Sequence, residues 1–265
     1  MILPEPAPSG RVVAVRPSSS AALAPLAAGP AALPVLAVTG LAKEGRLAAG
    51  PGVAAIGAGG NPHRLRAMLA ERTDPACRAV VSIGIAGGLD PDLLPGDVVI
   101  ASGVRVGGHR YGADAAIVEA LRARLAGSGL RVISGDLAGV DAAVLSLEGK
   151  ADLWARTGAA AVDMESHVAA AFAERHALPF AAIRVVCDPA HRALPAFAAQ
   201  ALKPNGEPDI LAVLGALARG SAKVRGLVRL ARDSRAAFGS LARCRARLGP
   251  GLGIPLPEEP LREVA

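Results

Sequence analysis

The stretch Ala79-Val80-Val81-Ser82-Ile83-Gly84-Ile85 runs directly into Ala86-Gly87-Gly88, and this pattern decides the fold. An apolar run of this length is typical of a buried strand, and the glycines that follow it are typical of a turn. Ligands of α/β sheets bind at the carboxyl ends of the strands. We therefore expect Gly87 to let the backbone approach a compact ligand at this turn.

The same pattern occurs twice earlier in the chain. Apolar runs at residues 35–38 and 53–56 each end at glycine, and helical periods follow them at residues 41–48 and 62–72. A repeated unit of strand, glycine-rich turn and helix favours a mainly parallel sheet. The fold class is therefore predicted to be α/β, with a central mixed, mainly parallel sheet flanked by helices.

Further elements complete this arrangement. Apolar runs predict strands at residues 97–101, 130–134 and 180–186. Helical periods predict helices at residues 114–126, 147–157, 164–176, 209–217 and 221–248.

Composition limits the class of protein. The chain has 265 residues, of which 52% are hydrophobic and only 2% aromatic, so one large core packed with aliphatic side chains is expected. The three cysteines are far apart and lack metal-site spacing, which predicts neither a disulfide framework nor a metal site. A reducing cytoplasm is the simple interpretation.

Positive charge is concentrated near the C-terminus. Residues 221–247 carry eight Lys or Arg residues against the single Asp233, while the rest of the chain is nearly neutral. This distribution argues against nucleic acid as a partner. The segment has helical apolar spacing, so two alternatives stay open: an amphipathic helix on an anionic inner membrane surface, or a helix packed on the core with a solvated basic face.

Three segments are expected. Residues 1–33 are rich in Pro, Ala and Ser and predict a poorly structured extension whose one strand-like run is residues 11–15. Residues 34–220 form the catalytic domain, and residues 221–265 form the basic helix and tail. The glycine turns match neither the dinucleotide fingerprint nor a P-loop, so no nucleotide cofactor is predicted.

Two carboxylates stand where chemistry is expected. Met164 and Glu165 lie at a strand-to-helix junction, and Asp188 follows the strand at residues 180–186. One carboxyl group of such a pair can donate a proton to a leaving group, and the other can fix a polar substrate. Glu165 and Asp188 fit these two tasks. The structural alternatives are a first-turn acid favoured by the helix dipole and a carboxylate that caps the turn at Pro189.

Two separated motifs carry a family resemblance. Residues 82–91 with 95–99, and residues 162–166 with Asp188, resemble the superfamily of purine nucleoside phosphorylases and methylthioadenosine/S-adenosylhomocysteine nucleosidases. The resemblance implies a single nucleoside-phosphorylase-like domain that associates with further copies of itself. It also implies that Asp188 protonates the purine N7, that Glu165 accepts hydrogen bonds from the ribose hydroxyls, and that Met164 packs on the sugar.

These motifs do not determine which group, water or phosphate, attacks the sugar. In hydrolytic relatives a glutamate after the first strand activates water, and Glu44 stands at the matching distance. Phosphate is the alternative co-substrate, because the backbone amides of Gly40 and residues 57–60 can cradle an anion. An anionic Glu44 repels phosphate, so electrostatics favour water. The structural alternative places Glu44 and Arg46 on the exposed face of the first helix.

The base pocket is expected at residues 134–139. Nucleosidase relatives carry an aromatic side chain there, whereas this chain has Leu137 and Ala138. An apolar pocket can still hold a purine by shape and by backbone hydrogen bonds. Asp141, just after this segment, is interpreted as a turn residue.

The C-terminal part most resembles the hopanoid-associated phosphorylase branch, on residues 191–195, 202–206 and 248–251. This resemblance implies cleavage of adenosyl hopane, a lipid-linked purine nucleoside, to adenine and a ribosyl or ribosyl-phosphate hopane. Two alternatives remain: a hydrolytic methylthioadenosine/S-adenosylhomocysteine-type nucleosidase, and a non-catalytic relative that binds a nucleoside or lipid. The expected location is the cytoplasm or the inner membrane surface.

Overall fold

The computed structural model describes residues 33–195 and 224–255. These residues form eight strands: β1 (Val35–Thr39), β2 (Val53–Gly57), β3 (Ala79–Gly88), β4 (Val98–Val106), β5 (His109–Gly112), β6 (Val132–Gly139), β7 (Ala161–Asp163) and β8 (Phe180–Asp188). Their helices are α1 (Ala42–Ala48), α2 (Pro62–Ala70), α3 (Ala115–Leu125), α4 (Leu147–Thr157), α5 (Ser166–Arg175) and α7 (Val224–Leu248), followed by a 3-10 turn at Pro250–Gly253. The predicted α/β fold with a mixed, mainly parallel sheet is confirmed.

The sequence prediction places most elements within a few residues of their observed bounds. Strand β5 is missed because its sequence, His-Arg-Tyr-Gly, is polar and reads as a turn. It pairs antiparallel with β4 at the edge of the sheet. The predicted strand at residues 11–15, the predicted helix at residues 209–217 and nearly all of the 1–33 extension lie outside the described residues.

Side-chain caps define where several helices begin. The side chains of Asn61, Asp114 and Ser146 accept hydrogen bonds from backbone amides in the first turns of α2, α3 and α4, respectively. These bonds satisfy amides that have no partner within the helix. Helix α4 ends at Gly158, which has a left-handed backbone conformation (φ 62°) that favours glycine.

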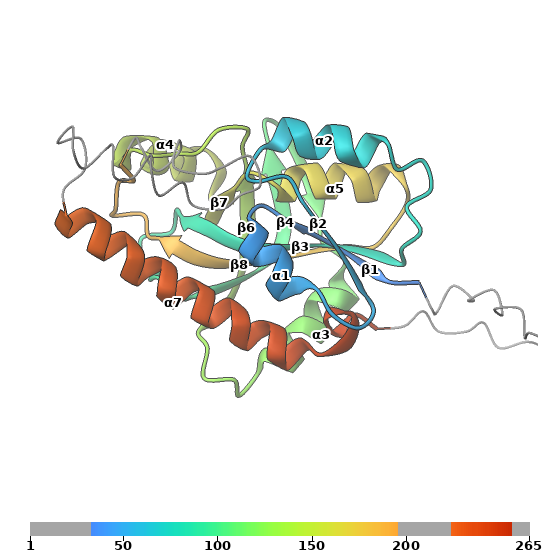
Figure 1. Ribbon diagram of the computed structural model, residues 1–265. Coiled ribbons are helices and arrows are strands. Elements are labelled where there is room, and N and C mark those ends of the chain that lie inside the picture. The colour runs from blue at the N-terminus through green and yellow to red at the C-terminus, as the bar shows by residue number, and fades with distance from the viewer. Residues whose placement is uncertain (1–32, 196–223, 256–265) are drawn as a thin grey trace, which may run out of the picture.

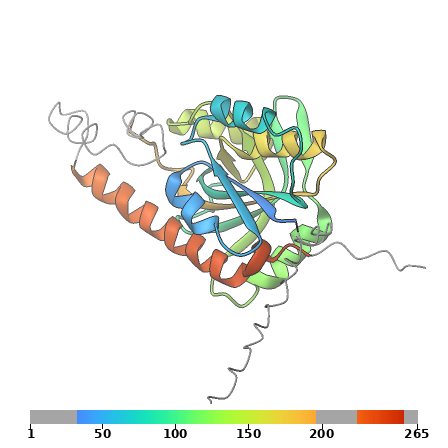
Figure 2. The same cartoon turned by 45° about the vertical axis from the view of Figure 1, so that its right-hand side comes forward.

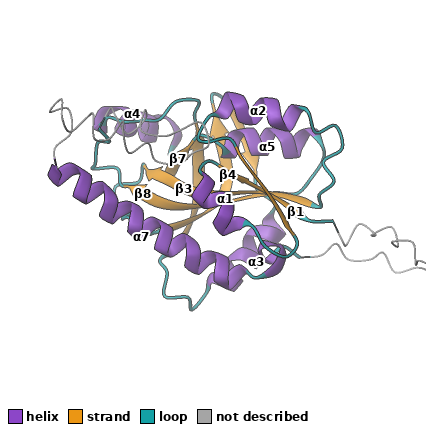
Figure 3. Ribbon diagram, in the orientation of Figure 1, coloured by secondary structure: helices purple, strands orange, loops and turns teal. Residues whose placement is uncertain are grey.

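The strand pairings form a closed circuit. Strand β3 pairs with β8, β8 with β4, β4 with β6, β6 with β7, and β7 returns to β3. Strands β1 and β2 extend the sheet beyond β3, and most pairings are parallel. The strands lie between two groups of helices, as Figure 3 shows by colour. This circuit brings the ends of β3, β7 and β8 together.

The core has two main parts, one on each face of the sheet. Strand β8 is buried along its whole length, and its alternate side chains enter different clusters: Ala182 and Val186 pack with α5, whereas Ile183 and Val185 pack with α3 and α7. A strand covered on both faces needs apolar side chains on both. The continuous apolar runs in the sequence are therefore explained by this burial.

Helix α7 packs along the sheet as part of the same body (Figures 1 and 2). Leu241, Cys244 and Leu248 are buried in the cluster shared with β8 and α3, and Phe238 packs against it. The apolar side of its C-terminal half is therefore used by the core. No helix among residues 33–195 and 224–255 is both long enough and apolar enough to cross a membrane.

Candidate active site

A cavity of about 280 Å³ opens where the carboxyl ends of β1, β3 and β8 meet β7. Six of the residues predicted to act on the substrate line this cavity: Gly40, Glu44, Gly87, Met164, Glu165 and Asp188. They come from distant parts of the chain, and the strand circuit brings them together.

The structure does not bring Leu137 and Ala138 to the cavity. Both residues are fully buried in β6, where Leu137 packs in the large core cluster and Ala138 packs beside Leu153 of α4. Strand β6 continues through the segment in which the base pocket was expected, and the chain reaches the cavity only after this strand ends. Val140 and Val144 then line the wall.

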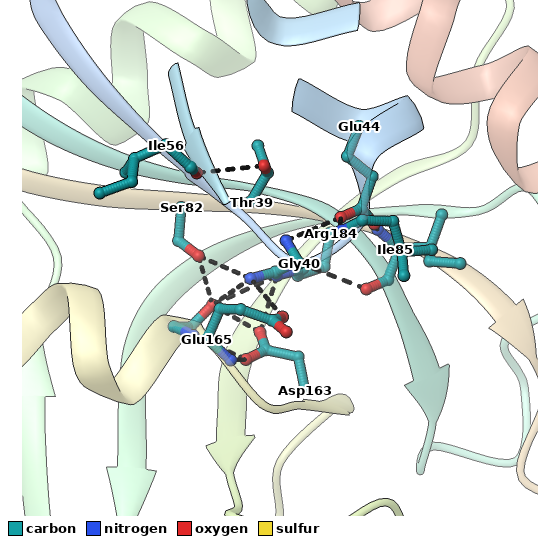
Figure 4. A network of polar contacts seen from close by, with 11 residues as sticks. Thr39, Gly40, Glu44, Ile56, Ser82, Ile85, Asp163, Glu165 and Arg184 are labelled. Carbon is teal, nitrogen blue, oxygen red and sulfur yellow. Dashed lines mark hydrogen bonds and ion pairs between the residues drawn. The ribbon is translucent and has the colours of Figure 1, made fainter. Parts of the chain in front are cut away.

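A buried guanidinium organises one end of the cavity (Figure 4). Arg184 of β8 has no exposed surface, and its Nε lies 2.7 Å from Oδ2 of Asp163. Its terminal nitrogen NH2 lies 3.4 Å from Oε2 of Glu165, and Glu44 also interacts with it electrostatically. One cation therefore faces three carboxylates. We call these four residues the acid-rich end of the cavity.

The carboxylate of Glu44 is held by backbone amides. Its Oε2 accepts hydrogen bonds from the amides of Gly40 (2.8 Å) and Leu41 (2.7 Å), and its Oε1 accepts one from Ile85 (2.7 Å). A glutamate at the third position of a helix often reaches back in this way. Glu44 is only 2% exposed, so the alternative that it lies on the exposed face of α1 is wrong, whereas Arg46 is exposed.

Two of the amides considered as an anion cradle are therefore already engaged. The Gly40 amide donates to Glu44, and the Gly60 amide donates to the carbonyl of Gly40 over 3.0 Å. Burial raises the pKa of Glu44, although Arg184 and the three amides favour its ionised form. A carboxylate with a raised pKa, in contact with a cavity, is suited to accept a proton.

Glu165 is buried beside more acidic groups than cations. Burial raises its pKa to about 8, and the neighbouring charges of Asp163 and Glu44 add to the effect of burial while Arg184 opposes it. Its carboxylate lies against Gly40, where a Cβ atom would come within 2.6 Å of Oε1. Any larger residue at position 40 would displace this carboxylate from the cavity.

Asp163 has a supporting position beside Glu165. Its Oδ1 accepts hydrogen bonds from the backbone amides of Glu165 (2.9 Å) and Ser166 (2.7 Å), at the start of α5. It thereby fixes the strand-to-helix junction that presents Met164 and Glu165. Its other carboxyl oxygen, Oδ2, accepts from Ser166 Oγ and pairs with Arg184.

Gly84 allows the acid-rich end to assemble. A Cβ atom at this position would lie 2.5 Å from both a guanidinium nitrogen of Arg184 and Oε1 of Glu44. Ser82, two residues earlier, is fully buried and accepts a hydrogen bond from Arg184 over 2.6 Å. The hydroxyl of Ser82 therefore supports the guanidinium and does not line the cavity.

Asp188 lines the cavity at the carboxyl end of β8. A register shift between β3 and β8 sets Asp188, and not Cys187, beside Gly87. A Cβ atom at position 87 would lie 3.1 Å from Oδ2 of Asp188. Lys150 of α4 lies 2.6 Å from the same oxygen, and both side chains are buried. We call Asp188 and Lys150 the paired end of the cavity.

Burial raises the pKa of Asp188, and Lys150 opposes this rise by favouring the carboxylate. Asp188 is thus a carboxyl group that can exist in either protonation state beside a cavity. The alternative that it only caps the Pro189 turn leaves its place in the cavity lining unexplained.

Sequence reasoning missed Arg184 and Lys150. Arg184 interrupts the apolar run of residues 180–186, and a charge inside a buried strand is a signal that it has partners. Lys150 carries no comparable signal, because lysine is an ordinary residue of an amphipathic helix. Only the tertiary structure shows that it points inward.

Asp141 lies outside the cavity lining. Its exposed carboxylate lies 2.6 Å from Arg66 of α2 and 3.0 Å from the buried His167 of α5. It ties a loop to two helices, in agreement with its interpretation as a turn residue. Within the described part of the chain, no three His, Cys, Asp or Glu side chains are arranged to hold a metal ion.

Comparison with known proteins identifies the family. Residues 13–219 match the model of the phosphorylase superfamily, which covers more than half of the chain. No curated protein matches the sequence.

Solved structures share the fold at low sequence identity. The 5'-methylthioadenosine/S-adenosylhomocysteine nucleosidase of Neisseria meningitidis, in complex with methylthio-immucillin-A, is 19% identical with a TM-score of 0.59, covering 83% of this chain and 97% of that one. The S-adenosylhomocysteine nucleosidase of Streptococcus pyogenes is 15% identical with a TM-score of 0.57, covering 83% and 98%. The futalosine hydrolase of Helicobacter pylori is 13% identical with a TM-score of 0.57, covering 80% and 97%. At these identities the comparisons establish the fold alone.

Proposed function

The chain belongs to the phosphorylase superfamily, and we propose that it cleaves the N-glycosidic bond of a purine nucleoside with water as the attacking group. The observation that carries this proposal is the position of Glu44. Its carboxylate already occupies the amides of Gly40, Leu41 and Ile85, which would otherwise be available to an anion.

Charge at the acid-rich end supports water over phosphate. Arg184 faces Asp163, Glu165 and Glu44, so this end has more negative than positive groups. A phosphate dianion would be repelled, whereas a neutral water molecule would not. Water attacks C1' of the ribose, and Glu44 takes its proton. The same negative charge stabilises the positive charge that develops on the sugar.

Glu165 and Met164 serve the sugar. A carboxyl group lining the cavity accepts hydrogen bonds from ribose hydroxyls on both oxygens, and most strongly, when it is ionised. With a pKa of about 8 in the substrate-free protein, Glu165 serves this role best after losing its proton, so ribose binding is coupled to proton release. Met164 also lines the cavity and packs on the sugar ring.

Asp188 serves the base. As the glycosidic bond breaks, its electron pair moves to the purine, and a proton at N7 makes the purine a better leaving group. Asp188 supplies this proton from the paired end of the cavity. The reaction balances because water has given one proton to Glu44 and Asp188 has given one to the base.

The side chains that line the wall of the cavity indicate which kind of substrate it suits. Five of its lining residues are aliphatic and come from the β6–α4 connection and the segment after β8: Val140, Ala143, Val144, Leu145 and Leu194. An aliphatic wall suits an apolar 5' substituent. Together with the resemblance of the C-terminal part, this supports adenosyl hopane as the substrate. A methylthioadenosine-type nucleoside, whose 5' substituent is also apolar, is the second candidate.

We further propose that α7 contacts an anionic membrane surface. Six arginines of α7 have exposed side chains: Arg225, Arg229, Arg232, Arg235, Arg243 and Arg247. The one acidic residue of the helix, Asp233, is buried against Arg192. Substituting Arg225, Arg229 and Arg232 by Gln leaves the core contacts intact. These changes are expected to weaken binding to phosphatidylserine vesicles, and unchanged binding would contradict the contact.

The decisive experiment uses the full chain with adenosyl hopane and with methylthioadenosine, each with and without phosphate. We expect adenine to be released without phosphate, and the sugar product to carry oxygen from ¹⁸O-labelled water. A strict need for phosphate, with a sugar 1-phosphate as product, would overturn water as the attacking group. If neither substrate releases adenine, a non-catalytic binding protein becomes the better interpretation.

A variant connects this activity to the site. Asp188→Asn keeps the shape of the carboxyl group but cannot protonate the base, so adenine release is expected to fall by about 10²- to 10⁴-fold. Asp152→Asn, on the exposed face of α4, is the matched control. Equal activity of the two variants would contradict the role of Asp188.

A further inference from the structure

Lys150 is the buried cation that the proposed mechanism leaves unused. It lies in the first turns of α4, yet its side chain is only 1% exposed. Its ammonium group donates to Oδ2 of Asp188 (2.6 Å), and to the carbonyl oxygens of Asp188 (3.0 Å), Pro189 (3.0 Å) and Arg192 (3.1 Å). Four acceptors within this range fully occupy a lysine.

Three of these acceptors belong to the turn that follows β8. Carbonyl groups at residues 188, 189 and 192 converge on one ammonium group, so Lys150 fixes the shape of this turn. The turn is fixed from the other side as well, because the Arg192 guanidinium pairs with the buried Asp233 of α7. Asp188 is thereby held between α4 and α7.

The fourth acceptor is the carboxyl group itself. Because Lys150 engages Oδ2, the proton that Asp188 can transfer is the one on Oδ1. The neighbour of Asp188 on β3 is Gly87, which pairs with Val162 of β7, and neither residue carries a charge. The charged groups that act on it are Lys150 and, from α7, Asp233, whose own charge is offset by Arg192.

Resting on the function proposed above, we propose that Lys150 is a positioning residue that orients the Asp188 carboxyl toward the base and stabilises the carboxylate left after its proton moves to the purine N7. The proton goes from Oδ1 to N7, the electron pair of the broken C1'–N9 bond goes to the base, and the new negative charge on Asp188 is neutralised by the adjacent ammonium group. No further reactant is required.

This role predicts a distinctive pH dependence. A general acid works only while it is protonated, so the rate falls as the pH rises through its pKa. Lys150 favours the carboxylate and so lowers the pKa of Asp188 relative to the same burial without it. Removing the charge makes Asp188 a weaker acid that stays protonated to higher pH. The maximal rate should fall, while the alkaline limb of the profile should move upward.

The test measures kcat/KM against pH for the full-length wild type and for Lys150→Met, with a purine nucleoside and with 4-nitrophenyl riboside. Nitrophenolate leaves without protonation, so it does not need Asp188. For the purine nucleoside we expect a plateau about tenfold lower and an alkaline limb shifted upward by at least one pH unit. For the nitrophenyl substrate we expect a change of less than about threefold.

Lys150→Gln is the second variant, because it keeps a neutral hydrogen-bond donor and avoids placing an apolar group against three carbonyls. If Lys150→Gln folds, its alkaline limb should show the same upward shift. This expectation holds even if Lys150→Met fails to fold. Asp152→Asn on the exposed face of α4 controls for changes in that helix. In the Asp188→Asn background, Lys150→Gln should cause no further loss of purine cleavage.

The outcomes separate the two proposals. Equal losses on both substrates at every pH, or an unshifted alkaline limb, would overturn the role of Lys150 while leaving purine cleavage in place. Failure of the wild type to release a base from any purine nucleoside would overturn the proposed function and this inference with it.

Discussion

The two ends of the cavity differ in how their buried ionisable groups are paired. At the acid-rich end, Arg184 faces Asp163, Glu165 and Glu44, so negative groups are in excess. At the paired end, one cation, Lys150, faces one acid, Asp188. Buried charges cost stability unless they are paired and hydrogen-bonded. Burial of these groups therefore costs stability at the acid-rich end, and the paired end avoids this cost.

The difference follows the direction of charge movement in the proposed reaction. Positive charge develops on the sugar, where an excess of carboxylates is favourable, and negative charge develops on the base, where a cation is favourable. Before substrate binds, burial raises the pKa of both Glu44 and Glu165, and at Glu165 the charges of Asp163 and Glu44 add to this rise.

Removing Arg184 should have the largest effect. Arg184→Met leaves Asp163 and Glu165 buried without their cation, and the loss of one partner of a buried pair destabilises a protein by about 3–5 kcal/mol. Arg156→Met is the control, because Arg156 lies 2.9 Å from Asp152 with both side chains exposed (64% and 65%), and exposed pairs contribute about 1 kcal/mol or less. Urea unfolding measures both. Similar losses of stability in the two variants would mean that the buried carboxylates of the acid-rich end do not depend on Arg184 for their stability.

Glu44→Gln should have the next largest effect, and on turnover. The amide cannot take a proton from water, so kcat is expected to fall by about 10²- to 10⁴-fold while KM changes little. Added azide, an anionic nucleophile that needs no base, should restore part of the rate. If kcat is retained without such an addition, Glu44 is not the base and only caps α1.

The fold could be predicted from the sequence because burial leaves a regular pattern. The run at residues 79–88 is apolar except for Ser82 because protein covers both faces of β3. Glycine after each strand marked the turns at which the cavity opens. Strand β5 left no such pattern, since an exposed edge strand of four residues needs no apolar side.

Some residues of the candidate site could likewise be predicted from the sequence, and others could not. Glu44, Glu165 and Asp188 stand at strand ends or helix starts, where sequence position alone indicates the cavity. Leu137 and Ala138 were placed there because nucleosidase relatives carry an aromatic side chain in this segment, but β6 continues through them into the core. Lys150 could not have been found, because its inward direction depends on how α4 packs above Asp188.

Glu165→Gln should increase stability at high pH while weakening ribose binding. Folding raises the pKa of Glu165 from 4.5 to about 8, so its favourable contribution is complete below pH 4.5 and is lost as the pH rises through 8. At pH 9 the variant should therefore be more stable than the wild type by about 1–3 kcal/mol, and the difference should vanish near pH 4.5. Unfolding measured across this range checks the sign. Glu148→Gln, at an exposed position in α4, should show no such trend.

The smallest effects should come from two glycines of β3, one for each end of the cavity. A Cβ at Gly84 would come within 2.5 Å of Arg184 and Glu44, whereas a Cβ at Gly87 would lie 3.1 Å from Asp188 and 3.2 Å from Val162. Overpacking a buried site costs about 1–3 kcal/mol, so Gly84→Ala should lose about 2 kcal/mol and Gly87→Ala less than 1 kcal/mol.

The two glycine variants should differ in chemistry as well as in stability. Gly84→Ala pushes Glu44 and Arg184 apart and should lower turnover on purine and nitrophenyl substrates alike, because both require an attacking water. Gly87→Ala moves only the Asp188 carboxyl and should lower turnover on the purine alone, since nitrophenolate needs no proton. The same pattern of loss in both variants would mean that the two ends do not act separately, and the charge asymmetry between them would then reflect burial alone.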